Sequence, residues 1–117
     1  MKVAIPTNDR LTVSERFGRS SYFTILTIEG GSIKSRADIA IGEYKGHKQL
    51  HEILKDCNAV ICLHLGPKIF GELRERGVKV YIIEKPVRIG EALEMYLNGR
   101  LKPAEKPAPC RFRKGSS

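Results

Sequence analysis

The sequence predicts a single α/β domain with helices on the faces of a mixed five-stranded sheet. Two runs rich in β-forming residues, 21–28 and 33–41, flank a Gly-Gly turn, which is the pattern of an antiparallel hairpin. After the hairpin, stretches with helical spacing alternate with short continuous apolar runs. Such alternation is typical of parallel strands joined by right-handed helical crossovers. The predicted order is therefore β-β-β-α-β-α-β-α, with only the second strand running against the others.

The elements before the first helix are strands and loops. Residues 2–5 form a β-branched run, which Pro6 is expected to end because proline has no N–H for strand pairing. The polar segment 7–20 is rich in turn residues and is expected to be a loop that contains at most one helical turn. Gly30 and Gly31 then join the two hairpin strands, since glycine tolerates the positive φ of a tight turn.

The second half of the chain supplies the helices. Helical spacing of apolar residues predicts helices over 47–57, from Pro67 to a stop at Gly77, and over 89–97. Proline suits the first turn of a helix and glycine the position just after its end. The continuous apolar run at 59–63 predicts a strand that is buried on both faces, and residues 78–83 are predicted to form the fifth strand.

Composition excludes several classes of protein. The 117 residues suit one domain, and no run approaches the about 18 apolar residues of a transmembrane helix. The N-terminal segment is too short before Pro6 for a signal peptide. Three cysteines without a Cys-x-x-Cys motif indicate thiols in a reducing cytoplasm. We therefore expect a cytoplasmic protein, and the single Gln and three Asn fit a heat-adapted source.

The C-terminal segment differs in charge from the rest. The chain carries a formal net charge of +8, of which residues 99–117 hold +5 and the first 98 residues +3. Residues 101–117 contain three prolines among basic residues, so we expect an extended or disordered tail outside a domain of residues 1–100. This tail should add little stability.

The positive charge also raises a nucleic-acid-associated function as an alternative. The charge is concentrated in the tail, however, and the body shows no interleaving of aromatic and basic residues. Nucleic acid is therefore not the favoured partner.

Ligands of open α/β sheets bind at the carboxyl ends of the parallel strands. Three loops are expected to meet there, at residues 7–20, 64–67 and 84–88. The sequence therefore predicts a site at this edge of the sheet.

An anion is one ligand that this edge could hold. Gly66, Pro67 and Lys68 place a helix N-terminus beside a glycine, where free N–H groups and the helix dipole favour negative charge. Arg16 and Arg19 could add positive charge. The alternative is a plain tight turn between strand and helix, which is common in α/β folds.

Three histidines are candidate metal ligands. His47 and His51 lie one helical turn apart, a spacing that can hold a metal, although such pairs are also common as exposed residues without one. His64 follows a predicted strand at the presumed ligand edge, where either packing or ligand binding would explain it. Cys62 lies within an apolar run and is expected in the core rather than in a metal site.

No catalytic constellation is present. The chain lacks Gly-x-Ser-x-Gly, His-Glu-x-x-His, a Walker loop and Gly-x-Gly-x-x-Gly. A sheet that begins with a hairpin is similar to the ribonuclease H architecture, but the first strand here has no carboxylate to hold magnesium. We therefore expect neither a nuclease nor any other enzyme.

One family resemblance covers about residues 1–100. The segments that carry it are Met1–Thr7, Val13–Phe23, Gly46–Leu54, Val60–Cys62, Leu65–Pro67 and Glu91–Gly99. In these segments the chain resembles the dinitrogenase iron-molybdenum cofactor family of NifX, NafY and the C-terminal part of NifB. The resemblance implies a ribonuclease H-like three-layer α/β/α sandwich. It also implies a protein that carries iron-molybdenum cofactor, or a related Fe–S or Mo–S cluster, without transforming it.

The resemblance gives the candidate residues their expected roles. His47, His64 and His51 would be the metal ligands, while Arg16, Arg19, Gly66, Pro67 and Lys68 would hold the anionic cluster. Arg16 stands where many members of the family have histidine, and His64 where many have a small residue before the Gly-Pro turn.

The expected partners are therefore the cluster and a cofactor-delivery protein, with no membrane. The chain itself would be a monomer or a weak homo-oligomer. A regulatory or interaction module that binds no cluster is the alternative function, because a fold alone does not determine function.

Overall fold

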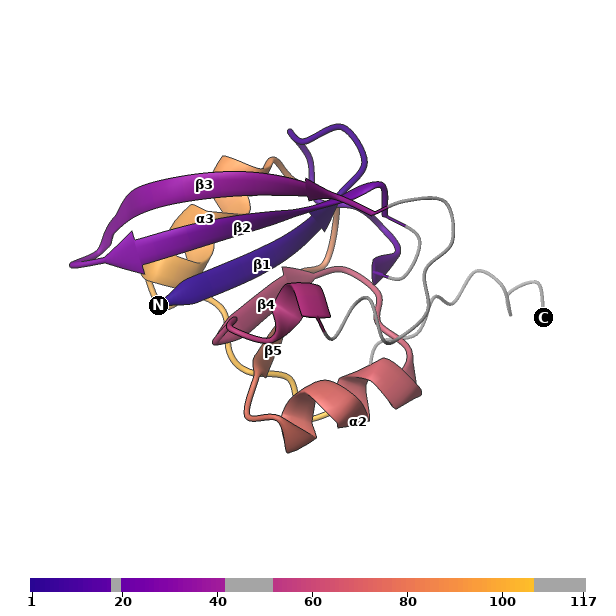
Figure 1. Cartoon of the computed structure of the whole chain (residues 1–117). Helices are drawn as coiled ribbons and strands as arrows, with labels where there is room; N and C mark the ends of the chain where they lie inside the picture. Colours follow the sequence, from indigo (N-terminus) through magenta and orange to yellow (C-terminus); the bar gives the residue numbers. More distant parts are fainter. Residues whose placement is uncertain (18–19, 42–51, 107–117) are drawn as a thin grey trace.

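A computed structural model describes residues 1–17, 20–41 and 52–106 and confirms the mixed five-stranded sheet (Figure 1). The elements are β1 (Lys2–Thr7), β2 (Tyr22–Glu29), β3 (Ser32–Ala40), β4 (Ala59–Cys62), α2 (Pro67–Glu75), β5 (Lys79–Ile82) and α3 (Ile89–Leu97). The strands lie in the order β3-β2-β1-β4-β5. β2 is antiparallel to both of its neighbours, whereas β4 and β5 continue parallel to β1, so only β2 runs against the rest.

Helices cover both faces of the sheet and give three layers. Successive residues of the central strands enter different cores, as Val60 and Ile61 of β4 do. Phe70 and Leu73 of α2 pack on the first face, and Ala92 and Leu93 of α3 pack on the second. Of the helix predicted over 47–57, only the end lies within the described residues, where 52–54 are helical. None of the helices in the described ranges is long and apolar enough to span a membrane.

The first strand is longer than predicted, because it continues through Pro6 to Thr7. The expectation that Pro6 ends the strand was wrong for a geometric reason. Pairing of β1 with β4 covers only Val3 and Ala4, whereas pairing with β2 continues to Thr7, with Pro6 opposite Phe23. At Pro6 the strand therefore has a ladder neighbour on one side only, a position that tolerates a missing N–H.

β3 forms one edge of the sheet and is exposed along its whole length. Ile33 and Ile39 are among the few large apolar side chains that face solvent. The pairing of β3 with β2 shifts register between Thr27 and Ile28, so the strand carries a bulge next to Lys34. A bulge and a lysine are common means of protecting a sheet edge from unwanted pairing.

The opposite edge of the sheet is covered by the start of the C-terminal segment. The Ala104 N–H donates to the Val80 carbonyl at 2.7 Å, and Pro103 bridges to Tyr81 of β5. Leu101 and Ala104 pack against the two cores. Residues 101–106 therefore lie against β5, so the first part of the segment that was expected to be an extended or disordered tail is docked on the domain.

Deleting residues 102–117 should lower the free energy of unfolding by about 1–2 kcal/mol. The deletion removes a strand-type hydrogen bond and the apolar contact of Ala104. Denaturant titration followed by circular dichroism measures the loss. Deleting only residues 107–117 is the matched control, which should retain the docked segment and unfold close to the wild-type midpoint. Equal midpoints for the two truncations would contradict this role of residues 102–106.

Candidate functional site

The three loops expected at the carboxyl edge of the sheet do meet there. The Val13 N–H donates to the Val87 carbonyl at 2.9 Å, which ties the first loop to the loop after β5. The Phe17 N–H donates to the His64 carbonyl at 3.2 Å, which ties the same loop to the turn after β4. The first loop therefore bridges the other two and holds them together.

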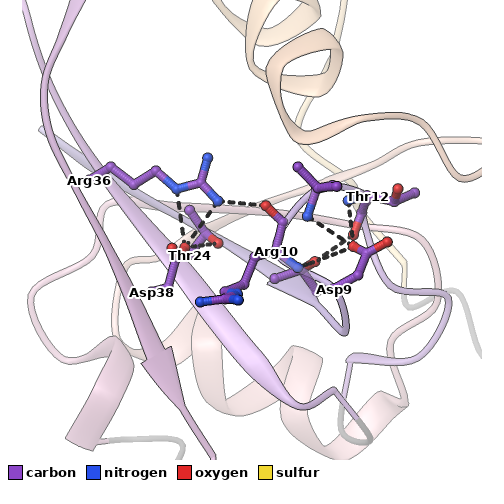
Figure 2. Close-up of polar contacts among 8 residues, drawn as sticks. Asp9, Arg10, Thr12, Thr24, Arg36 and Asp38 are labelled. Carbon is purple, nitrogen blue, oxygen red and sulfur yellow. Dashed lines mark hydrogen bonds and ion pairs between the residues drawn. The ribbon is translucent and has the colours of Figure 1, made fainter.

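The first loop is organised around the carboxylate of Asp9. Its Oδ1 accepts the Leu11 N–H at 2.9 Å and the Thr12 N–H at 2.8 Å. The Thr7 hydroxyl is 3.3 Å from the same oxygen, accepts the Arg10 N–H and lies 2.7 Å from the Thr12 carbonyl. Figure 2 shows Asp9, Arg10 and Thr12 close together in this loop. The backbone N–H groups of Leu11 and Thr12 lower the pKa of Asp9. The sequence predicts only a loop for this segment, because the hydrogen-bond network forms together with the pairing of Thr7 and Val13, which local sequence does not specify.

Replacing Asp9 with Asn should lower the thermal midpoint at neutral pH. Asparagine can accept the same backbone hydrogen bonds but lacks the charge that strengthens them. A carboxylate with a lowered folded-state pKa stabilises the fold above its unfolded value and loses this contribution as pH falls through the folded value. The difference in thermal midpoint between Asp9→Asn and wild type should therefore have its full size well above pH 3.8, the ordinary pKa of an aspartate. It should become smaller as the pH falls below that value.

Thermal unfolding of both proteins between pH 2 and pH 7 checks this expectation. Glu84→Gln is a suitable control, since Glu84 is exposed and makes no hydrogen bond within the described residues. A midpoint difference for Asp9→Asn that does not change with pH would contradict the electrostatic role of Asp9.

His64 has an unusual environment at this edge. Its side chain is half-buried, and within the described part of the chain the buried Nδ1 atom has no hydrogen-bond partner. The other ring nitrogen, Nε2, is not among the buried atoms without a partner. Within the described residues the structure therefore shows an unsatisfied Nδ1, and the role of Nε2 as a ligand atom is part of the proposal below. A buried, unpaired ring nitrogen costs stability and calls for an explanation.

The N-terminus of a helix and two basic residues lie close to His64 in the structure or in the sequence. Gly66 is the N-cap of α2 and Pro67 its first residue. Within the described ranges, no side chain caps this helix, and its first turn contains no acidic residue. Lys68 is exposed on that turn. Arg16 precedes the residue that bonds to His64, and its carbonyl accepts the Ser20 hydroxyl at 2.8 Å. The structure thus brings together five of the predicted residues, Arg16, His64, Gly66, Pro67 and Lys68.

The other predicted site residues lie outside the described ranges. They are Arg19, His47 and His51. Their roles stay predictions. Within the described ranges, no group of three or more His, Cys, Asp or Glu side chains is arranged to hold a metal ion.

The two described cysteines belong to the core. Cys57 and Cys62 are buried, and both pack in the cluster on the α2 face of the sheet. Burial raises the pKa of the Cys57 thiol to about 11 and that of Cys62 to about 12. Both side chains are therefore protonated thiols at neutral pH rather than the thiolates that bind metals. This agrees with the expectation that Cys62 is a core residue.

Comparison with known proteins supports the resemblance seen in the sequence. A family model described as dinitrogenase iron-molybdenum cofactor matches residues 1–99. Uncharacterized protein MJ0580 of Methanocaldococcus jannaschii is 31% identical over 115 residues, which cover 90% of this chain and 92% of that protein.

Solved structures share the architecture. The NMR structure of TM1290 from Thermotoga, provisionally assigned as a NifB protein, superposes with a TM-score of 0.65 at 30% identity, covering 87% of this chain and 91% of that one. The apo form of the orange protein from Desulfovibrio gigas gives a TM-score of 0.75 at 19% identity, covering 91% and 94%. The latter likeness concerns the fold alone.

Proposed function

Because this chain belongs to the dinitrogenase iron-molybdenum cofactor family, we propose that it binds and carries an anionic metal–sulfur cluster at the carboxyl edge of its sheet. The cargo would be iron-molybdenum cofactor or a related Fe–S or Mo–S cluster. The protein would hold this cluster without transforming it and pass it to a delivery partner.

The observation that carries the proposal is the environment of His64. Imidazole is a suitable ligand for iron and related metals. The side chain is half-buried, and we assign the metal to its Nε2, because Nδ1 is buried and has no hydrogen-bond partner in the described residues. A metal bound at Nε2 would supply the interaction that fixes the imidazole ring at this edge of the sheet.

The charge around His64 suits a cluster rather than a bare cation. A metal–sulfur cluster brings its own sulfides, so few protein ligands are needed, and its net charge is negative. The uncapped N-terminus of α2 offers free N–H groups to such an anion. Lys68 adds a positive charge on the same turn, and Arg16 could donate hydrogen bonds to a cluster sulfide.

The remaining candidates complete the proposed site. We assign Arg19 to the group that holds the anion, and His47 and His51 to the group of additional metal ligands. Each of these three residues is tested by substitution with Ala. The amount of metal–sulfur cluster that each variant retains is compared with that of wild type after the anaerobic reconstitution described below.

Anaerobic reconstitution tests the proposal. The full chain is incubated without oxygen with iron-molybdenum cofactor or, separately, with tetrathiomolybdate, and is then separated by gel filtration for metal counting. The expected result is co-elution of about one cluster per chain with at least one of the two. If neither co-elutes with folded protein, the carrier function is wrong and the interaction module becomes the better account.

A further inference from the structure

A recess lies apart from the residues around His64. It has a volume of about 920 Å³ and opens between the first loop, β3 and α3. None of Arg16, His64, Gly66, Pro67 or Lys68 contributes to its lining. We call this recess the arginine groove, because four arginines from four separate segments line it.

The four arginines reach the groove from different parts of the fold. Arg10 comes from the first loop, Arg36 from β3, Arg88 from the N-cap of α3, and Arg100 from the segment that follows α3. Glu91 and Glu94 line the same groove, so four positive charges face two negative ones. The groove therefore has an excess of positive charge.

Two of the guanidinium groups are fixed before any ligand binds. The Arg36 Nη2 donates to the Arg10 carbonyl at 2.6 Å, and its Nε donates to Asp38 at 3.1 Å (Figure 2). Asp38 also accepts the Thr24 hydroxyl at 2.7 Å. Arg10 stacks over the Tyr22 ring, with its guanidinium carbon 5.2 Å from the ring centroid. Groups held in place in this way lose less entropy when a ligand binds.

The charge of Asp38 is maintained by these contacts. Burial acts to raise its pKa, but the hydrogen bonds from Thr24 and Arg36 and the charges of Arg36 and Arg10 outweigh burial and lower it. Asp38 therefore remains a carboxylate that holds Arg36 in place.

The backbone of Arg10 is strained. Its φ is +65°, the left-handed region that non-glycine residues rarely adopt. The Thr7 hydroxyl accepts the Arg10 N–H at 2.9 Å, and Asp9 holds the next two N–H groups. The loop thus maintains a costly conformation whose effect is to present Arg10 beside Arg36.

The other two arginines have unused hydrogen-bonding capacity. In the described part of the chain, the guanidinium groups of Arg88 and Arg100 make no ion pair or hydrogen bond, although Glu91 and Glu94 line the same groove. Each therefore retains its full set of donors for an external anion.

We propose that the arginine groove binds an organic phosphate. A phosphate group has several oxygens directed to different sides, so it can accept from guanidinium groups that approach from different segments. A carboxylate offers only two oxygens in one plane. The phosphate of the ligand would meet Arg10, Arg36 and Arg88, which lie on the loop, the strand and the start of the helix.

The rest of the lining indicates that the ligand is larger than free phosphate. The groove is far larger than a single phosphate ion, and volumes of this size are typical of sites for small organic molecules. Glu91, Glu94 and Asn98 offer acceptors for hydroxyl or amino groups, and Leu11 offers exposed apolar surface. A nucleotide or a sugar phosphate combines these features.

An NMR titration of the ¹⁵N-labelled full chain tests the proposal. ATP, ribose 5-phosphate, inorganic phosphate and adenosine are added separately at low ionic strength, without any metal–sulfur cluster. We expect saturable shifts of the amides of residues 10–12, 36 and 88–91 with one of the two organic phosphates, weaker binding of phosphate and none of adenosine. If inorganic phosphate binds as tightly as ATP and ribose 5-phosphate do, the groove recognises the free ion, and the proposal of an organic phosphate is wrong.

Variants locate the binding. Arg88→Ala removes an exposed side chain without a partner in the described residues, and it should weaken binding about tenfold by removing a charge-assisted hydrogen bond. Arg36→Lys keeps the charge but loses the planar fork, so it should also weaken binding. The matched control is Arg76→Ala, at the far end of α2, which should bind as wild type does.

Unchanged affinity in Arg88→Ala would overturn the proposal, as would shifts that map to Lys68 or to the C-terminal residues instead of the groove. Because the titration contains no cluster, its outcome is independent of whether the chain carries one.

Discussion

Replacing Phe17 with Ala should lower the free energy of unfolding by about 3–5 kcal/mol, the usual cost of removing a buried aromatic ring. The Phe17 side chain is only 2% exposed, and its ring centroid is 5.1 Å from that of Phe23 in a tilted arrangement. Truncation would therefore leave a cavity between the first loop and β2. Because domains of this kind are stable by about 5–15 kcal/mol, a large share of the total would be lost.

Urea denaturation followed by far-ultraviolet circular dichroism measures this loss. Phe17→Leu is the matched control, since it keeps an apolar side chain at the position and should cost clearly less than Phe17→Ala. A loss below about 1 kcal/mol for Phe17→Ala would mean that the first loop is not anchored in the core by this side chain.

Replacing His64 with Ala should reduce retention of a metal–sulfur cluster by about tenfold or more, with little effect on stability. The loss of retention follows if Nε2 is a direct ligand, because the alanine side chain has no atom that can bind the metal. Stability should be nearly unchanged, since the substitution also removes a buried nitrogen that has no hydrogen bond in the described residues. Anaerobic gel filtration with metal counting measures retention, and thermal unfolding of the apo protein measures stability.

Lys68→Ala provides the comparison for His64→Ala. Lys68 is exposed on the first turn of α2 and would act only through its charge. Its loss should weaken cluster binding modestly, and the effect should fade at high ionic strength because exposed charges are screened. If His64→Ala retains as much cluster as wild type at every salt concentration, His64 is not a ligand.

The sequence was sufficient for the elements whose signals are local. Pro67 and Gly77 limit α2 because proline favours the first turn and glycine can take a positive φ, which is +81° here. The hairpin turn is likewise set by Gly30 and Gly31, both of which have positive φ. These signals need no knowledge of distant contacts.

Features that depend on distant neighbours could not be predicted in this way. Pro6 remains in β1 because the register with β4 ends early, and residues 101–106 dock because β5 leaves an edge for them. The composition of the tail contains no information about that edge.

The candidate site also has features that the sequence predicts and features that depend on distant contacts. That loops meet at the carboxyl edge follows from the topology of parallel strands, which the sequence pattern indicated. The unpaired Nδ1 of His64 arises from side-chain packing, which the pattern does not specify. The arginine groove was missed because Arg10, Arg36 and Arg88 are far apart in the sequence and only the fold brings them together.

The docking of residues 101–106 on β5 leaves the sheet with a single open edge in the described part of the chain, at β3. Association of two such molecules through their β3 edges would be self-limiting. The two open edges would be consumed in one pair, and neither molecule would offer a further edge on which a third could add. A chain truncated before residue 101 would expose both edges and could extend head to tail without closure. The C-terminal segment would therefore restrict edge-to-edge association to pairs of molecules, in addition to its expected contribution to stability.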